Sequence, residues 1–470
     1  MNKSPILYRQ IAMVAAVVLA GCSLAPTYER PAAPLAPQWP QPLPAAVAPA
    51  APAAGDLHWN KFFLNPSLRE LIRLALDNNR DLRIAVLNIE QARATWQVRR
   101  ADQFPTLNLG ATGIVQPKAD GSGGTSSAYT AGLSITGWEL DFFGRVASLK
   151  DAALAQFLAT EQARLAVQAG LIAAVATTWL NLQTDEEFIA LTKQTLITRE
   201  DSLRLTRLRL DNGAASRLDV RQAESLTAGA QATLQQNLRQ RAQDINALTL
   251  LVGQPLTDDL LKAASATARP QFADVPAGLP SDLLVQRPDI RQAEQQLIAA
   301  NANIGAARAA FFPRISLTAA YGSASSGLTN LFQNGFLGGT LGAQALLPIF
   351  DAGRNEANLA SSKAARDIAV AQYEKTIQTA FREVADALAG RATLAEQLAA
   401  QQAQVDAEAD RFRLADLRYR NGVASYLEVL DAQRSLFILQ ATLAQVRLAY
   451  WQNQVTLYKV LGGGATPPPT

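Results

Sequence analysis

The spacing of apolar residues along the chain changes twice from a helical period to a strand period. Residues 81–103 are helical in composition and end at Pro105, and the apolar residues that follow alternate with polar ones, as they do in a strand. A turn-rich loop and a second alternating stretch come next, so we predict a β-hairpin over 104–143. The same order after 289–311 predicts a second hairpin over 312–351. Strands of roughly ten residues with one apolar face are typical of membrane β-barrels.

Each predicted hairpin is followed by a long stretch without proline, which predicts a long helix. The stretches 145–211 and 354–420 each contain one glycine, and a continuous helix of this length spans about 100 Å. An Asn-Gly pair follows each stretch, a combination that favours a helix stop and a turn. We therefore predict helical hairpins over 145–252 and 354–461. The two shorter helices of each unit nearly match the long one in summed length, so we expect them to stack end to end beside it.

Within the first long helix, residues 165–180 are apolar enough to resemble a transmembrane helix. The equivalent residues of the second long helix, 374–389, include Arg382, Glu383 and Asp386. Two equivalent helices should not lie one in lipid and one in water. We interpret the alanines of 165–180 as close helix packing.

The two halves of the chain are copies of one unit. "FPTLNL" (104–109) matches "FPRISL" (312–317), and the Asn-Gly pair at 212 matches the pair at 421, with offsets of 208 and 209 residues. A nearly constant offset indicates an internal duplication. We predict a signal peptide over 1–21, a Pro/Ala-rich arm over 22–58, a first repeat over 59–255, a linker over 256–280, a second repeat over 281–462 and a tail over 463–470.

The N-terminus carries the pattern of a lipoprotein signal. Lys3 and Arg9 form a positively charged n-region. The ten apolar residues 11–20 that follow are too few to span a bilayer. "LAGC" at 19–22 resembles a lipobox, in which Cys22 becomes the lipidated first residue of the mature protein. Ser23 is not the aspartate of the usual inner-membrane retention signal, which favours a lipid-anchored protein of the outer membrane. Ordinary cleavage that leaves a free thiol is the alternative.

Composition argues against several classes of function. The net charge is +3, and Lys and Arg are spread along the chain without the basic patch that indicates nucleic-acid binding. Cys22 and His58 are the only residues of their types, whereas a zinc site needs three or four ligands. No nucleophile–base pair or phosphate-binding loop is visible. We expect no catalytic residues, no metal and no cofactor.

Four strands are too few to close a barrel in a membrane. An open sheet edge leaves unpaired N–H and C=O groups in lipid, and the smallest barrels have about eight strands. Cyclic association of identical chains satisfies every edge. The residues alone therefore require at least two chains. A small soluble sheet on a coiled-coil rod is the alternative.

Three segments carry a resemblance to a known family. They are "WNKFFLNPSLRELIRLALDNNRDLRIA" (59–85), "WELDFFGR" (138–145) and "YRNGVASYLEVLDAQRSLF" (419–437). They resemble the TolC- and OprM-like outer membrane factors, in particular the RND efflux outer membrane lipoproteins of the NodT branch.

The resemblance implies an α+β membrane protein. Each chain would supply four transmembrane β-strands and long periplasmic helices to a homotrimer, in which a twelve-stranded β-barrel stands on an α-helical barrel. It also implies work with a periplasmic adaptor and an inner-membrane RND pump, as the exit duct for drugs or other small molecules. A duct for type I protein secretion and a structural periplasmic lipoprotein without a channel are the alternatives.

The two copies of the turn differ in a way that suggests a gate. Leu210, Gln222 and Ser225 of the first repeat are replaced by Tyr419, Asp431 and Arg434 in the second. The resemblance implies that both turns, Asn212-Gly213 and Asn421-Gly422, lie at the periplasmic tip, where the adaptor binds. It also implies that the second return helix lines the aperture. Leu427, Asp431 and Arg434 lie on one helix face by their spacing. With Tyr419 they are the candidate gate, and an ordinary surface salt bridge is the alternative.

Overall fold

The computed structural model describes residues 24–34, 36, 38–39, 53–118, 124–264, 270–276, 280–333 and 336–465. The chain divides into two compact units. Unit 1 comprises Met1–Ala32, Asn88–Glu161 and Gln292–Glu374, and unit 2 comprises Ala33–Leu87, Gln162–Arg291 and Lys375–Thr470.

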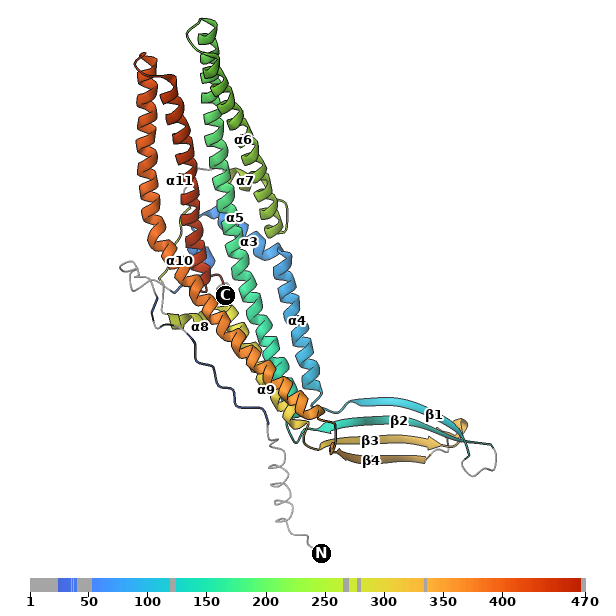
Figure 1. The fold of residues 1–470 in the computed structure, drawn as a ribbon. Helices are drawn as coiled ribbons and strands as arrows, with labels where there is room; N and C mark the ends of the chain where they lie inside the picture. The colour runs from blue at the N-terminus through green and yellow to red at the C-terminus, as the bar shows by residue number, and fades with distance from the viewer. Residues whose placement is uncertain are drawn as a thin grey trace. The chain divides into compact units, whose positions relative to one another are not determined.

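Unit 1 contains one antiparallel sheet of four strands in sequence order (Figure 1). The strands are β1 (Leu107–Pro117), β2 (Thr125–Leu140), β3 (Arg314–Ser325) and β4 (Phe336–Leu346). Each repeat contributes one hairpin, and β2 pairs with β3 to join the two repeats. The strands β1 and β4 lie at the two edges of the sheet, and each pairs with only one neighbouring strand.

The pairing of β2 with β3 depends on two facing glycines. Gly132 pairs with Gly322. A β-carbon on Gly132 would lie 2.4 Å from the Tyr321 carbonyl oxygen, and one on Gly322 would lie 2.3 Å from that of Ala131. The close backbone approach therefore requires glycine on both strands. β2 is 16 residues long, longer than the roughly ten predicted, because an irregularity next to Gly137 lets the strand continue to Leu140.

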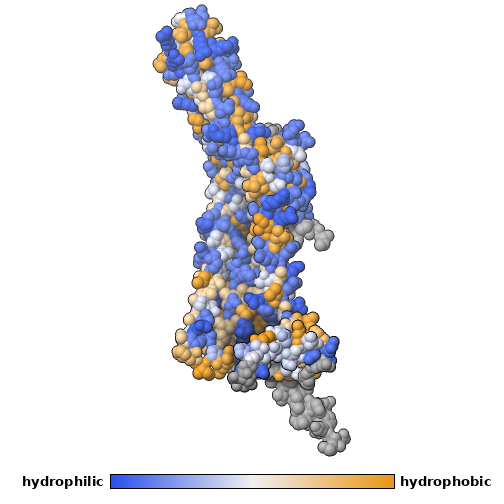
Figure 2. Space-filling model, turned by 90° about the vertical axis from the view of Figure 1, so that its right-hand side faces the viewer, coloured by the Kyte–Doolittle hydropathy of each residue, from blue (hydrophilic) through white to orange (hydrophobic). Residues whose placement is uncertain are grey.

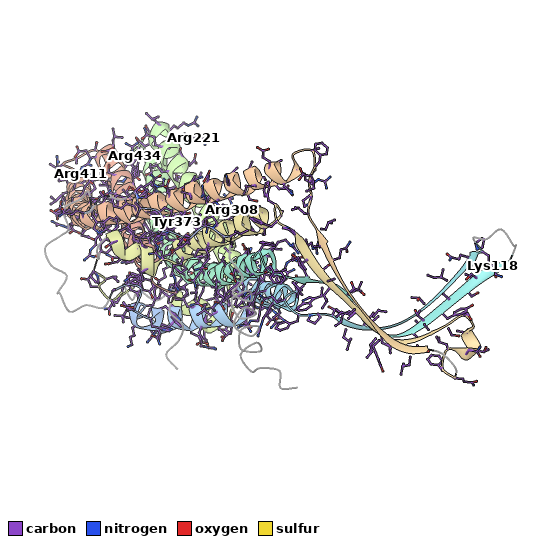
Figure 3. The ribbon with its side chains drawn as sticks, turned by 90° about the horizontal axis from the view of Figure 1, so that it is seen from below. Lys118, Arg221, Arg308, Tyr373, Arg411 and Arg434 are labelled. Carbon is purple, nitrogen blue, oxygen red and sulfur yellow. The ribbon has the colours of Figure 1, made fainter. Side chains whose placement is uncertain are left out.

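The sheet has no second layer on the described part of its surface. All eleven residues of β1 are exposed, and Leu109 and Leu341 are 82% and 75% exposed. Apolar side chains reach the surface over the sheet in Figure 2, and Figure 3 shows the strands as one curved ribbon with side chains on both faces. Such a sheet is stable as a barrel wall, with lipid against its apolar side chains.

The helices follow the proline-free stretches. α5 (Arg145–Asp211) and α10 (Arg354–Arg420) are the two long helices, with 67 residues each, as predicted. The return helices are α6 (Arg217–Val252) and α11 (Tyr426–Val460). The helices before the strands are α4 (Arg80–Ala101) and α9 (Pro288–Ala309). Short helices complete the described chain: α2 (Trp59–Phe62), α3 (Pro66–Asn78), α7 (Asp258–Ala264), η1 (Pro280–Asp282), α8 (Leu283–Gln286) and η2 (Leu328–Asn330).

The predicted end-to-end stacking of the shorter helices is confirmed in unit 2 by equivalent hydrogen bonds. The Asn79 side chain, just before α4, donates to the carbonyl of Leu251 near the end of α6 at 2.9 Å. The Arg287 side chain, just before α9, donates to the carbonyl of Val460 at the end of α11 at 3.1 Å. The two donors differ in chemistry but occupy equivalent positions in the repeats. Each satisfies a carbonyl that a helix end leaves without an intrahelical partner.

The alanine-rich segment of α5 packs inside unit 2. α5 is the one described helix with the length and composition to cross a membrane, and half of its most apolar window is buried within the chain. Val175, Ala176, Trp179 and Leu180 are at most 1% exposed. This burial agrees with helix packing as the reason for the alanines.

An aromatic cluster joins the start and the end of the folded chain in unit 2. The Tyr458 ring on α11 stacks on Phe62 with centroids 4.0 Å apart, and its hydroxyl donates to the Leu57 carbonyl at 2.6 Å. Phe62 and Phe63 are at most 1% exposed. Burying one such side chain contributes about 1.5–3 kcal/mol, so this cluster fixes the C-terminal end of α11.

Candidate gate at the ends of the helical hairpins

The two Asn-Gly turns have the same geometry. The side chains of Asn212 and Asn421 each donate to the carbonyl four residues earlier at 2.7 Å. Gly213 and Gly422 follow with φ of 72° and 75°, a left-handed conformation that glycine adopts without steric cost. These four residues are the predicted tip turns, and they end both helical hairpins of unit 2 in the same way.

The starts of the two return helices are held differently. Ser216 and Asp219 form a capping box at the start of α6, which satisfies free N–H groups of the first turn. Ser425 makes no such bond at the start of α11. Glu428, at the position of Asp219, instead forms an ion pair with Arg418 of α10 at 3.3 Å. The first turn of α11 is therefore tied to α10 by charge.

Asp431 is the centre of a chain of alternating charges. It accepts a hydrogen bond from Arg411 of α10 at 2.6 Å and one from Arg434 of α11 at 2.9 Å. Arg411 also donates to Glu408 at 2.7 Å. Figure 3 shows Arg411 and Arg434 on these two neighbouring helices. The hydrogen bond from Arg411, followed by the nearby charges, lowers the pKa of the Asp431 carboxyl below its usual range. Asp431 is therefore ionised, and it links α10 to α11.

Leu427, Asp431 and Arg434 lie on one face of α11, as their spacing predicts. The Asp431 carboxylate on this face is paired with arginines. Leu427 is 63% exposed, and Asp431 and Arg434 pair along α11 as their spacing indicates. Sequence reasoning missed Arg411. Its contact with Asp431 crosses the turn, and the pattern within either helix contains no signal for it. Two acids and two bases make up the group, so their formal charges cancel.

Residues that the duplication sets at equivalent positions line one groove. Leu427, Asp431 and Arg434 from α11 face Gln222 and Ser225 from α6 across a cleft of about 260 Å³. Gln222 is the repeat counterpart of Asp431, and Ser225 is that of Arg434. The side of α6 that lacks the charges therefore faces the side of α11 that has them.

Tyr419 lies in a separate aromatic cluster. Its ring packs against Tyr426, with centroids 5.2 Å apart, and the Arg209 guanidinium of α5 lies 4.6 Å from its centroid. Tyr426 is hydrogen-bonded to Ser202 of α5. Among the described interactions, none joins Tyr419 to Asp431. Within one chain, Tyr419 therefore links α10 to α5 and is not part of the ion chain.

The first hairpin has its own charge cluster at another position. Glu224 of α6 accepts from Arg207 of α5 at 2.8 Å and from Arg221 of α6 at 2.7 Å. The arrangement resembles that of Asp431, with one arginine across the hairpin and one on the same helix. Hydrogen bonds from these two arginines lower the pKa of Glu224. This cluster is a matched internal control for the gate.

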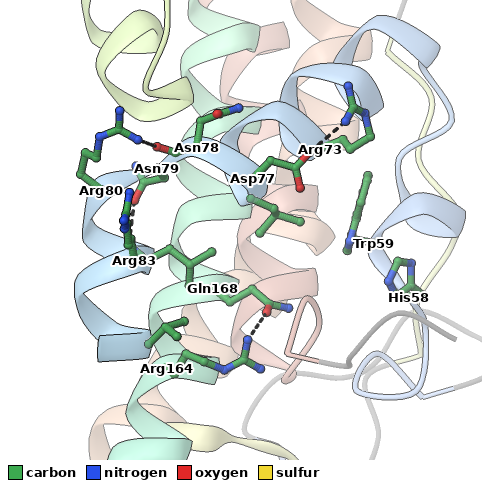
Figure 4. Close-up of a pocket in the computed structure, with 13 residues that line it drawn as sticks. His58, Trp59, Arg73, Asp77, Asn78, Asn79, Arg80, Arg83, Arg164 and Gln168 are labelled. Atoms are coloured by element: carbon green, nitrogen blue, oxygen red, sulfur yellow. Dashed lines mark hydrogen bonds and ion pairs between the residues drawn. The ribbon is translucent and has the colours of Figure 1, made fainter. Parts of the chain in front are cut away.

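Another cleft of unit 2 contains none of the predicted gate residues. It has a volume of about 650 Å³ and is lined by Trp59, Asp77, four arginines and their neighbours around the junction of α3 and α4 (Figure 4). His58, on its wall, accepts a hydrogen bond from the Asn60 N–H at 3.4 Å and so caps α2. Among the described residues, no group of three or more His, Cys, Asp or Glu could hold a metal ion.

Comparison with known proteins identifies the family. The model of the outer membrane efflux proteins matches residues 71–254 and 279–463, one segment in each half of the chain. The chain belongs to the outer membrane efflux protein family. The chain is 48% identical over 457 residues to the probable efflux pump outer membrane protein TtgC of Pseudomonas putida, and the match covers 96% of this chain and 94% of the relative.

Two solved structures show the same fold. The crystal structure of a membrane protein from Pseudomonas aeruginosa is 44% identical and superposes with a TM-score of 0.86, covering 94% of this chain and all of the other. The open state of the Neisseria gonorrhoeae MtrE outer membrane channel is 38% identical with a TM-score of 0.85, covering 94% and 99%.

The resemblance drawn from the three sequence segments is thus confirmed. This efflux protein has the fold of the outer membrane channels, a trimeric β-barrel continued by a helical barrel. It is the outer-membrane component of an efflux pump, and it extends into the periplasm. Cys22, the predicted lipid attachment site, lies outside the residues that the structure describes.

Proposed function

We propose that this outer membrane efflux protein is gated at the free ends of its helical hairpins, with Leu427, Asp431, Arg434 and Tyr419 as the gate. The observation that carries the proposal is the groove in which Leu427, Asp431 and Arg434 face the uncharged side of α6. A gate needs groups that hold its helices together and can be separated. The ion pair of Asp431 with Arg411 joins α10 to α11, and exposed ion pairs of this kind exchange readily with water.

An apolar ring at Leu427 would complete the closure. Its side chain is 63% exposed in the single chain, close to the turn at which α11 begins. In a cyclic trimer, three copies of a residue that faces the axis form a ring. Apolar constrictions close channels by excluding water. Tyr419 would support this state by holding α10 against Arg209 of α5.

The two tip turns would provide the contact with the periplasmic adaptor. Asn212, Gly213, Asn421 and Gly422 are all exposed, and their backbone hydrogen bonds are satisfied within each turn. Rigid, exposed turns of equal geometry suit one repeated binding mode. Six such turns per trimer would present a ring of similar sites to an adaptor.

Attachment of lipid at Cys22 is supported by the way in which the adjacent arm binds α9 in unit 1. The Arg308 side chain donates to the Leu24 carbonyl at 3.1 Å, and the Asn301 side chain donates to that of Pro26 at 2.7 Å. A β-carbon on Gly305 would lie 2.8 Å from Ala25, so glycine permits the close approach. α9 ends five residues before β3 begins. The arm is therefore fixed near the strands from its first described residue onward.

A second contact secures the same arm farther along. Arg30 forms a bidentate pair with Glu294 at 2.6 and 2.7 Å, and Tyr28 donates to the same carboxylate at 3.0 Å. The Glu294 side chain is only 10% exposed. These bonds hold the chain end that follows Cys22 against unit 1, as a lipid anchor beside a barrel requires.

The transported molecules would be small and apolar or antibiotic-like. The relatives include proteins named for a toluene efflux pump and for an antibiotic efflux pump. We infer that the duct passes such molecules without chemical change. Selection among them would take place in the inner-membrane pump.

Site-directed labelling at Leu427 tests the gate. In a Leu427→Cys variant, a bulky cationic thiol reagent added to the trimer in a planar bilayer should reduce single-channel current, because the label occupies the constriction. Leu218→Cys is the matched control, since Leu218 is its repeat counterpart and has nearly the same exposure, 65% against 63%. Equal block of both variants, or block of Leu218→Cys alone, would refute the assignment of the gate to α11.

A further inference from the structure

Arg199 connects three helices next to the candidate gate. It lies on α5 and is 8% exposed. One of its Nη atoms donates to the Leu226 carbonyl of α6 at 2.8 Å, and its guanidinium carbon lies 5.5 Å from the centroid of the Phe437 ring on α11. The distance to the ring is within the range of a cation–π interaction. A single side chain thus bridges the first hairpin to the helix that carries the gate.

The charge of Arg199 has no counter-ion among the residues that the structure describes. Its Nε is buried and has no hydrogen-bond partner there, and no carboxylate forms an ion pair with it. Burial lowers the pKa of its guanidinium. A buried cation that is only partly hydrogen-bonded costs free energy compared with the same group in water. If Arg199 served only for packing, the folded protein would be more stable with an apolar side chain at this position.

Both partners of Arg199 lie close to the gate groove. Leu226, whose carbonyl accepts from Arg199, lines the groove with Asp431. Phe437 follows Arg434 by three residues and therefore lies one helical turn along the same side of α11. A shift of α11 at the gate must change the distance between Phe437 and Arg199.

The arrangement occurs once in the duplicated chain. The repeat counterpart of Arg199 is Glu408, and that of Phe437 is Ala228. Glu408 is used in a different way, as a partner of Arg411 in the ion chain. The contact between Arg199 and Phe437 is therefore not repeated by the duplication. Within one chain, it joins the first hairpin to α11.

We propose that Arg199 is a positioning residue of the gate, which holds α11 against α5 and α6 in the closed state and favours release when water reaches its charge. This inference rests on the proposed gate at Leu427, Asp431 and Arg434. The contacts of Arg199 and its charge act in opposite directions. The hydrogen bond to Leu226 and the ring of Phe437 favour the closed state, whereas hydration of the cation favours the open one.

The opposition predicts opposite effects for two substitutions at one contact. Phe437→Leu keeps an apolar side chain but removes the aromatic face, so the cation loses its partner and the channel should open more often, by about threefold or more. Arg199→Met replaces the cation with an apolar side chain of similar length, so the closed state should be favoured and the open probability should fall below that of the wild type. Phe437→Tyr retains the ring and should behave as the wild type.

The measurement is the open probability of purified trimers in planar bilayers, with thermal unfolding of each variant as a check on folding. Arg447→Met is the matched control. Arg447 links α11 to α5 through Glu187 at 2.8 Å, but it lies away from the groove and should leave the open probability unchanged. Agreement of Phe437→Leu, Arg199→Met and Phe437→Tyr with the three expected directions supports the proposal.

Three results would overturn it. If Arg199→Met opens the channel as much as Phe437→Leu does, the contacts of Arg199 only hold the gate closed, and hydration of its charge does not favour release. If both variants match the wild type while Asp431→Ser with Arg434→Ser opens the channel, the gate stands and Arg199 is not part of it. If that double variant also has the open probability of the wild type, the proposed gate is wrong, and the inference about Arg199 is wrong with it.

Discussion

Replacing Asp431 and Arg434 together with serine tests the gate most directly. Asp431 makes two charge-assisted hydrogen bonds, at 2.6 Å to Arg411 and 2.9 Å to Arg434, and the double substitution removes both. Arg411 keeps its bond to Glu408 at 2.7 Å. The side-chain link between α10 and α11 at this level is thus lost, while no charge is left without a partner.

The double substitution separates widening of the aperture from a change in its electric field. It removes one acid and one base from each chain, so the formal charge of the group does not change. We expect single-channel conductance to rise by about threefold or more, because the helices that form the constriction are released. The rise should persist at high salt, where screening shortens the reach of charges to about 3 Å.

The single variant Asp431→Asn isolates the field. It removes one negative charge per chain and leaves Arg411 and Arg434 without the carboxylate that they share. Ion selectivity should shift toward anions at about 0.1 M salt, where the screening length is about 10 Å, and much less at about 1 M. Reversal potentials in asymmetric salt measure this shift.

The matched control is Arg221→Ser with Glu224→Ser in the first hairpin, which breaks a cluster of nearly the same geometry. It should leave the conductance unchanged. A double variant at Asp431 and Arg434 that conducts like the wild type would mean that their ion pair is an ordinary surface contact. Leakage in the control alone would assign the gate to the wrong repeat.

Two further predictions concern other parts of the chain. Cys22→Ser should abolish incorporation of labelled palmitate while some trimer still inserts, because the barrel has its own affinity for the membrane; label on the variant would refute lipidation at Cys22. Burial, with the neighbouring Asp244, raises the pKa of the Asp185 carboxyl from 3.8 to about 7. The folded protein therefore holds a proton that the unfolded chain releases, and stability should fall as pH rises from 3.8 to about 7. Asp185→Asn should flatten this dependence of the trimer's melting temperature, and an unchanged slope would contradict the shifted pKa.

Much of the architecture could be predicted because it depends on short-range patterns. Helix continuity depends on the absence of proline, and helix ends depend on Asn-Gly, so the long helices α5 and α10 occupy the predicted 145–211 and 354–420. Strand alternation likewise predicted two hairpins. The extent of β2 was underestimated, because the continuation past Gly137 depends on pairing with β3.

The candidate gate could be predicted only in part. The spacing of Leu427, Asp431 and Arg434 places them on one face of α11, because the helical period alone decides this. The partner Arg411 and the facing residues Gln222 and Ser225 come from other helices. Their positions depend on how the hairpins pack, and no periodicity within a single helix contains that information.

The duplication, the helices and strands, and the need for more than one chain follow from the order of residues alone, because they depend on periodicity and on the hydrogen bonds that a sheet edge must make in lipid. Which side chains meet depends on the packing of the folded chain. This packing places Arg199 between α5, α6 and α11 and binds the arm at Arg30 to α9. Contacts between residues far apart in the chain depend on the angles and distances at which helices pack, and those are properties of the folded chain as a whole.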